Sequence, residues 1–134
     1  MSFVWIWYYK TEENNKIGES MPNILYLNPT TQNNINEYMP SIEALEKLAN
    51  FFSIFSDSTR IKIITALSMS DMCVNDLSVV LGLNQTTVSH QLKLLRQNSI
   101  VNTFRSGKTI YYSLSNSNVN DVMLKGVDCL LEAK

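Results

Sequence analysis

A run of polar side chains between Gln85 and Arg96 has the residue types and the spacing needed to contact the base edges and the phosphate backbone of a nucleic acid. Gln85 can form a bidentate pair with adenine, and the methyl groups of Thr86 and Thr87 can contact the methyl group of thymine. Two cations further along, Lys93 and Arg96, are better suited to phosphate groups. The residues of this run that we predict to bind DNA are Gln85, Thr86, Thr87, Ser89, His90, Lys93 and Arg96.

Two further cations lie beside a predicted hairpin tip. The segments 101–105 and 109–114 are rich in β-branched and aromatic residues, and Ser106-Gly107-Lys108 separates them. This pattern predicts two strands joined by a short turn. A hairpin next to a DNA-reading helix reaches an adjacent groove, so we predict that Arg105 and Lys108 also bind DNA.

The distribution of charge supports a nucleic-acid partner although the net charge is only −1. From Leu77 to Asn120 the chain has no Asp or Glu, and the four cations named above lie within that stretch. A cationic segment without carboxylates is typical of a surface that meets phosphates. From charge alone, a chance run on a solvated surface remains the alternative. The acids on either side include Glu37, Glu43, Glu46, Asp121, Asp128 and Glu132.

Helices must position these side chains, and their start and stop signals are readable. Apolar residues recur at three- and four-residue steps from Ile42 to Phe52, which indicates an amphipathic helix that Ser41 can cap. Asp57 is the better cap of a second helix, which Ser68-Met69-Ser70 interrupts. A last helix contains Val119, Val122, Met123, Val127 and Leu130.

Between these lie a short helix and the helix that carries the polar run. The short helix is predicted from about Val74 to Leu81, with Leu77, Val80 and Leu81 buried, and Gly82 supplies the left-handed turn that ends it. Asn84 caps the next helix, which runs to about Asn98. Its predicted inner face is Val88, Leu92 and Leu95.

The order helix, helix, short helix, turn, helix, hairpin predicts a mainly α fold with a small β-hairpin, the winged helix-turn-helix. A helical bundle with an incidental hairpin is the alternative. The first forty residues are rich in Asn and contain Pro22, Pro29 and Pro40, so we predict a weakly ordered arm over 1–40 and the DNA-binding domain over 41–134.

The opening apolar run and the two cysteines bear on where the protein acts. The run from Phe3 to Tyr9 is too short to cross a bilayer, and no basic segment or cleavage site accompanies it. Cys73 and Cys129 do not form the disulfide framework of a secreted domain. We therefore expect a cytoplasmic protein with reduced thiols and no membrane partner.

Several segments together resemble the ArsR/SmtB family of metal- and stress-responsive repressors. The resemblance covers the chain from about Ser41 to its end and leaves the first forty residues unmatched. It implies a symmetric dimer whose first and last helices form the interface, and repression that a ligand relieves by weakening DNA binding. The matching segments are Phe55-Ser56-Asp57-Ser58-Thr59-Arg60-Ile61, Cys73-Val74-Asn75-Asp76-Leu77, Gln85-Thr86-Thr87-Val88-Ser89-His90-Gln91-Leu92, Arg105-Ser106-Gly107-Lys108 and Tyr111-Tyr112-Ser113-Leu114.

The resemblance leaves the inducing signal open. Many relatives bind soft metals or arsenite through a Cys-x-Cys pair, of which Cys73 matches the first member and Asn75 replaces the second. A second family site, on the last helix, has no imidazole here. Cys73 is thus either a buried small residue or a sensing thiol for a thiophilic metal or metalloid, and a redox switch with Cys129 is a further alternative. The residues at the second site are Asn116, Asn118, Asp128 and Glu132.

These observations predict a sequence-specific DNA-binding repressor, a homodimer that a ligand or a thiol modification releases from its operator. One alternative is a winged helix retained as a protein-interaction module, and another is a metal-blind regulator without an inducer. An enzyme is not expected. The single histidine, His90, is assigned to DNA, so no base is left for a cysteine or serine nucleophile, and there is no glycine-rich phosphate loop.

Overall fold

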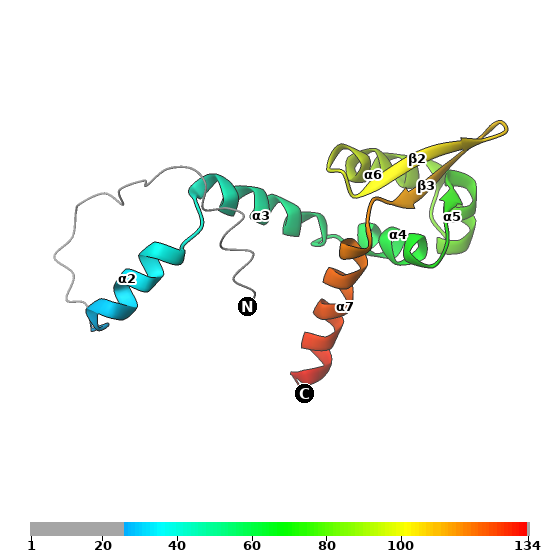
Figure 1. Ribbon diagram of the computed structural model, residues 1–134. Coiled ribbons are helices and arrows are strands. Elements are labelled where there is room, and N and C mark those ends of the chain that lie inside the picture. Colours follow the sequence, from blue (N-terminus) through cyan, green and yellow to red (C-terminus); the bar gives the residue numbers. More distant parts are fainter. Residues whose placement is uncertain (1–25, 134) are drawn as a thin grey trace. The chain divides into compact units, whose positions relative to one another are not determined.

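The computed structural model describes residues 26–133, and the chain divides into two units, one up to Asn50 and one from Phe51 onward. Within residues 26–133, every helix is too short or too polar to span a lipid bilayer. Figure 1 labels the helices and strands. The elements in chain order are α2 (Pro29–Tyr38), α3 (Ile42–Ile54), α4 (Ser58–Met69), β1 (Met72–Cys73), α5 (Val74–Leu81), α6 (Gln85–Gln97), β2 (Val101–Ser106), β3 (Thr109–Leu114) and α7 (Ser117–Glu132).

The first unit contains α2 and most of α3. The predicted weakly ordered arm lies outside the described residues up to residue 25, and over Pro29–Tyr38 the structure has a helix that was not predicted from the sequence. Its local signals are strong: Asn28 accepts a hydrogen bond from the Thr31 backbone N–H at 2.8 Å, and Pro29 starts the helix. The cap predicted at Ser41 is confirmed by the bond from the Ala44 N–H, at 3.2 Å.

The second unit has a single apolar core between α4, α6 and the sheet. Figure 1 shows α6 and the hairpin on one side of α4, with α7 leaving from the other side. The inner face predicted for α6 is confirmed, since Val88, Leu92 and Leu95 are fully buried. The core consists of Ile54, Ile63, Ile64, Ala66, Leu67, Leu77, Val88, Leu92, Leu95, Ile100, Val101 and Val119.

The turn between α5 and α6 is fixed by two caps and a glycine. Gly82 has φ +64°, in the left-handed region, and ends α5. Asn84 then accepts the Thr87 backbone N–H at 2.7 Å and starts α6. These predictions are confirmed. The predicted burial of Val80 was wrong, because this residue is 64% exposed. Within α5, which spans Val74–Leu81, Leu77 is the one fully buried residue.

The sheet has three strands in the order β1-β3-β2, all antiparallel. The predicted hairpin is confirmed, with Ser106 paired to Thr109, so that only Gly107 and Lys108 form the turn. Glycine suits the first central position of such a turn, where φ is +63°. The third strand, β1, was not predicted from the sequence; in it, Cys73 pairs with Tyr111.

Arg60 joins the end of α3 to α6. Its Nε donates to the Ile54 carbonyl at 2.8 Å and its Nη2 to the Ser53 carbonyl at 3.3 Å. The last carbonyls of a helix lack partners within the helix, and a cation there also meets the negative end of the helix dipole. The remaining nitrogen, Nη1, donates to Gln91 Oε1 at 3.4 Å. Arg60 therefore holds the helix that carries the polar run against the end of α3.

Gly82→Ala should lower the free energy of unfolding by about 1–2 kcal/mol, because an L side chain is strained at this positive φ. A Cβ at residue 82 would meet no atom within 4 Å, so the cost is conformational rather than steric. Urea denaturation measures it. The reciprocal change, Ser99→Gly, is the matched control. Ser99 follows Asn98, the C-cap of α6, and has φ +58°, so glycine there should raise the free energy of unfolding by about 0.5 kcal/mol. Equal signs for the two changes would contradict this account.

Candidate nucleic-acid interface

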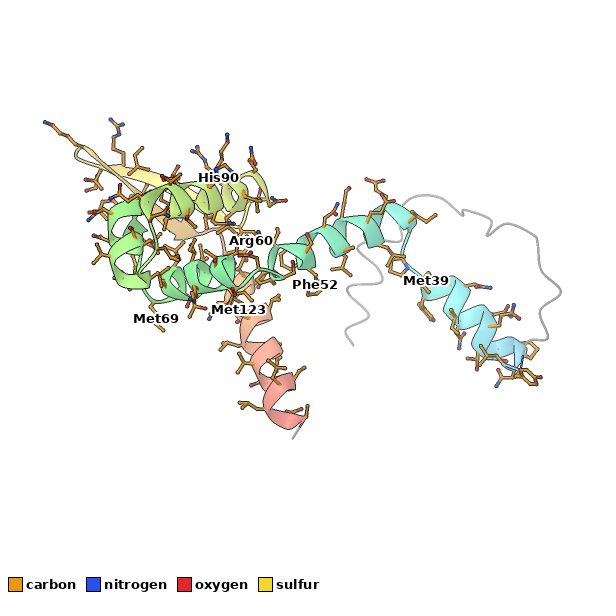
Figure 2. All side chains as sticks on the ribbon, turned by 180° about the vertical axis from the view of Figure 1, so that it is seen from behind. Met39, Phe52, Arg60, Met69, His90 and Met123 are labelled. Carbon is orange, nitrogen blue, oxygen red and sulfur yellow. The ribbon has the colours of Figure 1, made fainter. Side chains whose placement is uncertain are left out.

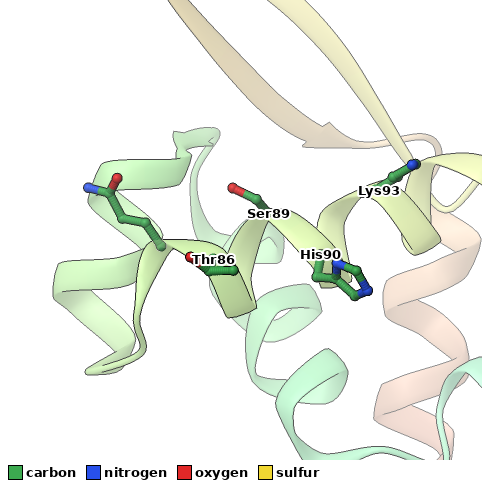
Figure 3. Close-up of a pocket in the computed structure, with 5 residues that line it drawn as sticks. Thr86, Ser89, His90 and Lys93 are labelled. Carbon is green, nitrogen blue, oxygen red and sulfur yellow. The ribbon is translucent and has the colours of Figure 1, made fainter.

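The outer side of α6 presents five exposed polar side chains around one open depression. Residues 86, 89, 90 and 93 recur at steps of three and four, so they share one side of the helix. Figure 3 shows Thr86, Ser89, His90 and Lys93 along successive turns of α6. The depression has a volume of about 450 Å³ and is lined by Gln85, Thr86, Ser89, His90 and Lys93.

Two other residues predicted for this side differ in their surroundings. Thr87 is half-buried, because it lies between the outer side and the buried Val88, and its backbone N–H is bound to the cap Asn84. Arg96 is exposed in the last turn of α6, next to the end of the helix. The structure therefore leaves Arg96 open to solvent and gives Thr87 only a partly accessible side chain.

The hairpin places its cations beyond the body of the second unit. Arg105 lies in β2 opposite Ile110, and Lys108 is in the two-residue turn; both are exposed. Figure 2 shows His90 on the same side of the unit as the hairpin, whose nitrogen-tipped side chains extend from its end. The α6 side chains and the hairpin thus face the same side, as two contacts with one duplex require.

Among the described residues, no carboxylate pairs with the positive charges of this side. In residues 26–133, ion pairs join Glu43 to Lys47 and Asp128 to Lys125, and all four residues lie outside α6 and the hairpin. In the first pair, the hydrogen bond from Lys47 lowers the pKa of Glu43 below its usual value. The cations of α6 and of the hairpin therefore remain available for phosphate groups.

One side chain that the sequence analysis did not assign to the interface contacts it directly. Gln85 Nε2 donates a hydrogen bond to Asn75 Oδ1 at 3.1 Å. Asn75 lies in the first turn of α5, ten residues before Gln85 in the chain. No spacing rule links the two positions, because the turn around Gly82 is what brings them together.

The described residues do not supply a set of metal ligands in one chain. Cys73 is half-buried at the start of α5, and the side-chain oxygen of Asn75 accepts a hydrogen bond from Gln85. Asp128 pairs with Lys125 at 3.7 Å. Between residues 26 and 133, no three His, Cys, Asp or Glu side chains gather where they could hold a metal ion. One thiol and one amide do not fit a soft metal, which prefers several thiolates.

The two cysteines are free thiols on separate elements. Cys73 lies in β1, against the hairpin strand β3, whereas Cys129 is exposed in the last turns of α7. Figure 1 shows α7 extending away from the sheet and α5. The structure does not bring the two thiols together within one chain, and a redox pair between them stays a prediction.

Sequence similarity decides the family. The profile of the family described as bacterial regulatory protein, arsR family, matches residues 57–103, from the cap of α4 into β2. Over 93 residues the chain is 33% identical to the transcriptional repressor SmtB homolog of Synechocystis sp., and the match covers 69% of this chain and 70% of that protein. The chain belongs to the ArsR/SmtB family.

Other members support the same assignment. This ArsR/SmtB protein is 35% identical over 94 residues to the cadmium resistance transcriptional regulatory protein CadC of Listeria innocua, covering 63% of this chain and 79% of that one. It is similar in structure to NolR from Sinorhizobium fredii, with a TM-score of 0.61 and 28% identity over 79% of this chain and 96% of that one. The predicted winged helix-turn-helix is confirmed.

Family membership also decides the class of activity. The chain is a DNA-binding transcriptional repressor of the ArsR/SmtB type and not an enzyme. The predicted helix order, the acid-free segment and the polar run all lie in or beside the matched residues 57–103.

Proposed function

We propose that α6 enters the major groove of an operator and that the hairpin contacts the groove beside it. The observation that carries this proposal is the exposed side of α6, where polar side chains surround an open depression and no carboxylate is present. Gln85, Thr86 and Ser89 read base edges near the start of the helix. Thr87 is a further base contact, through the part of its side chain that is accessible. The residues that bind phosphates or the flanking groove are His90, Lys93, Arg96, Arg105 and Lys108.

The repressor acts in the cytoplasm as a homodimer in this proposal, with α7 in the interface. The half of α7 after Met123 exposes Leu124, Val127, Leu130 and Leu131 to solvent in the single chain. Such a contiguous apolar face is covered in stable proteins. Two copies also match the symmetry of operators, whose half-sites lie about one helical turn apart. Sedimentation equilibrium measures the mass.

The division into an arm (1–40) and a domain (41–134) remains a prediction.

In this proposal a ligand or a thiol modification releases the repressor from its operator. A relative is named for cadmium resistance, so a thiophilic metal or metalloid ion is the class to test first. Cys73 is the one predicted ligand in the described residues, and one thiol would need further ligands from elsewhere. Arsenite, cadmium, zinc and an oxidant are titrated in parallel against the protein–DNA complex. Release that Cys73→Ser abolishes supports a thiol sensor, and release by none of them supports a metal-blind regulator.

A gel-shift titration against the promoter region of its own gene tests the function. We expect a specific complex whose affinity falls steeply as salt rises, because each phosphate contact releases counterions. A random duplex of equal length is the control and should bind at least about a thousandfold more weakly. Equal affinity for both duplexes would contradict sequence-specific repression, and salt-independent behaviour would favour a protein-interaction module.

A further inference from the structure

Gln85 is held by a neighbour before any DNA arrives. Its Nε2 donates to Asn75 Oδ1 across the turn between α5 and α6, at 3.1 Å. Among the five described side chains that line the depression on α6, Gln85 is the one with a side-chain hydrogen bond to another helix. Both partners are exposed, so the bond lies at the surface that meets the duplex.

The bond fixes the orientation of the Gln85 carboxamide. A carboxamide has two N–H donors and one carbonyl acceptor. Asn75 takes one donor, which leaves the second N–H and Oε1 for a base. These are the two groups that a bidentate contact with adenine N7 and N6 requires. Asn75 therefore leaves the reading edge of Gln85 free while it restricts the rotation of the side chain.

Restricting that rotation before binding favours the complex. A long side chain that is ordered only on binding weakens affinity by about twofold to tenfold. Asn75 supplies the acceptor without a negative charge, and a carboxylate at residue 75 would face the phosphates. The neutral amide is therefore suited to a position beside DNA.

We propose that Asn75 is a specificity-determining positioning residue, which orients Gln85 for base recognition without reading the base itself. The proposal rests on the proposed function, in which α6 lies in the major groove. It assigns a role to the residue that stands where the resemblance to metal-binding relatives would place a second cysteine. In this chain that position serves the DNA contact directly.

The test compares the sequence preferences of variants of the full chain on a library of duplexes with randomised positions. Gln85→Ala should abolish the preference at one base pair of each half-site. Asn75→Ala should reduce discrimination at that same base pair by about twofold to tenfold and leave the other positions unchanged. The double variant should match Gln85→Ala, because Asn75 acts only through Gln85. Gln97→Ala, at the far end of α6, is the matched control and should keep the wild-type profile.

Asn75→Asp separates the hydrogen bond from the charge. A carboxylate still accepts from Gln85 Nε2, so the pattern of preferences should persist while the affinity falls for all duplexes alike. Far-UV circular dichroism and the urea midpoint show that each variant is folded. Any of these results overturns the proposal: an unchanged profile in Asn75→Ala, a uniform loss of affinity in that variant, or an added effect in the double variant. A wild-type protein without sequence preference would instead overturn the proposed function itself.

Discussion

Lys93→Glu should lower the affinity for operator DNA by about a hundredfold, which corresponds to roughly 2.7 kcal/mol. The substitution removes a cation from the exposed side of α6 and places a carboxylate in a segment that otherwise has none. The lost phosphate contact and the repulsion between the new carboxylate and the phosphates both lower the affinity for DNA. Fluorescence anisotropy with the duplex that the wild-type protein selects measures the change.

The salt dependence shows whether the loss is electrostatic. The slope of log K against log salt should fall in magnitude by about 1 or more, because at least one phosphate contact is gone. Lys62→Glu is the matched control: it changes the net charge equally at an exposed position of α4, outside the predicted contacts. Equal losses for the two variants would mean that only net charge matters, and the assignment of α6 would be wrong.

Leu92→Ala should lower the free energy of unfolding by about 2–5 kcal/mol. Leu92 is fully buried beneath the polar side of α6, so truncation leaves a cavity in the core of the second unit. The loss is a large fraction of the stability of a typical domain, about 5–15 kcal/mol. Urea denaturation at a fixed protein concentration measures it, which matters because dimerisation adds to the apparent stability.

Leu94→Ala is the control for this effect. Leu94 lies on the same helix and its side chain is 36% exposed, so truncation removes fewer contacts and should cost about 1 kcal/mol or less. The side chains that we predict to contact DNA are unchanged in both variants. Equal costs for Leu92 and Leu94 would contradict the placement of the core.

Much of the second unit could be predicted because the ends of its helices are set by residues close to them in the sequence. Asp57 and Asn84 have side chains that accept a backbone N–H three residues on, and Gly82 adopts a backbone conformation that other residues avoid. Leu92 and Leu95 follow the helical period, which identifies the buried face of α6. The candidate interface followed from this, because the side opposite a buried face is exposed.

The features that the sequence analysis missed depend on contacts or on weak local patterns. The strand β1 has two residues, and it exists because Met72 and Cys73 pair with β3. The helix α2 has no buried residue within the described range and hence no apolar period to detect, although Asn28 and Pro29 are start signals. The bond between Asn75 and Gln85 arises from the geometry of a turn, which residue types alone do not fix.

The pairing of β1 with β3 has a consequence for the shape of the operator. Cys73 belongs to this strand pair and is also the residue from which α5 starts, so the chain segment that leads into α5 and α6 is hydrogen-bonded to the hairpin. We therefore expect the distance between α6 and the hairpin to change little when the protein binds DNA. The duplex then has to change its shape to match the protein. Base steps that let the duplex bend, or a groove widen, at little energetic cost should be favoured even where no side chain touches them.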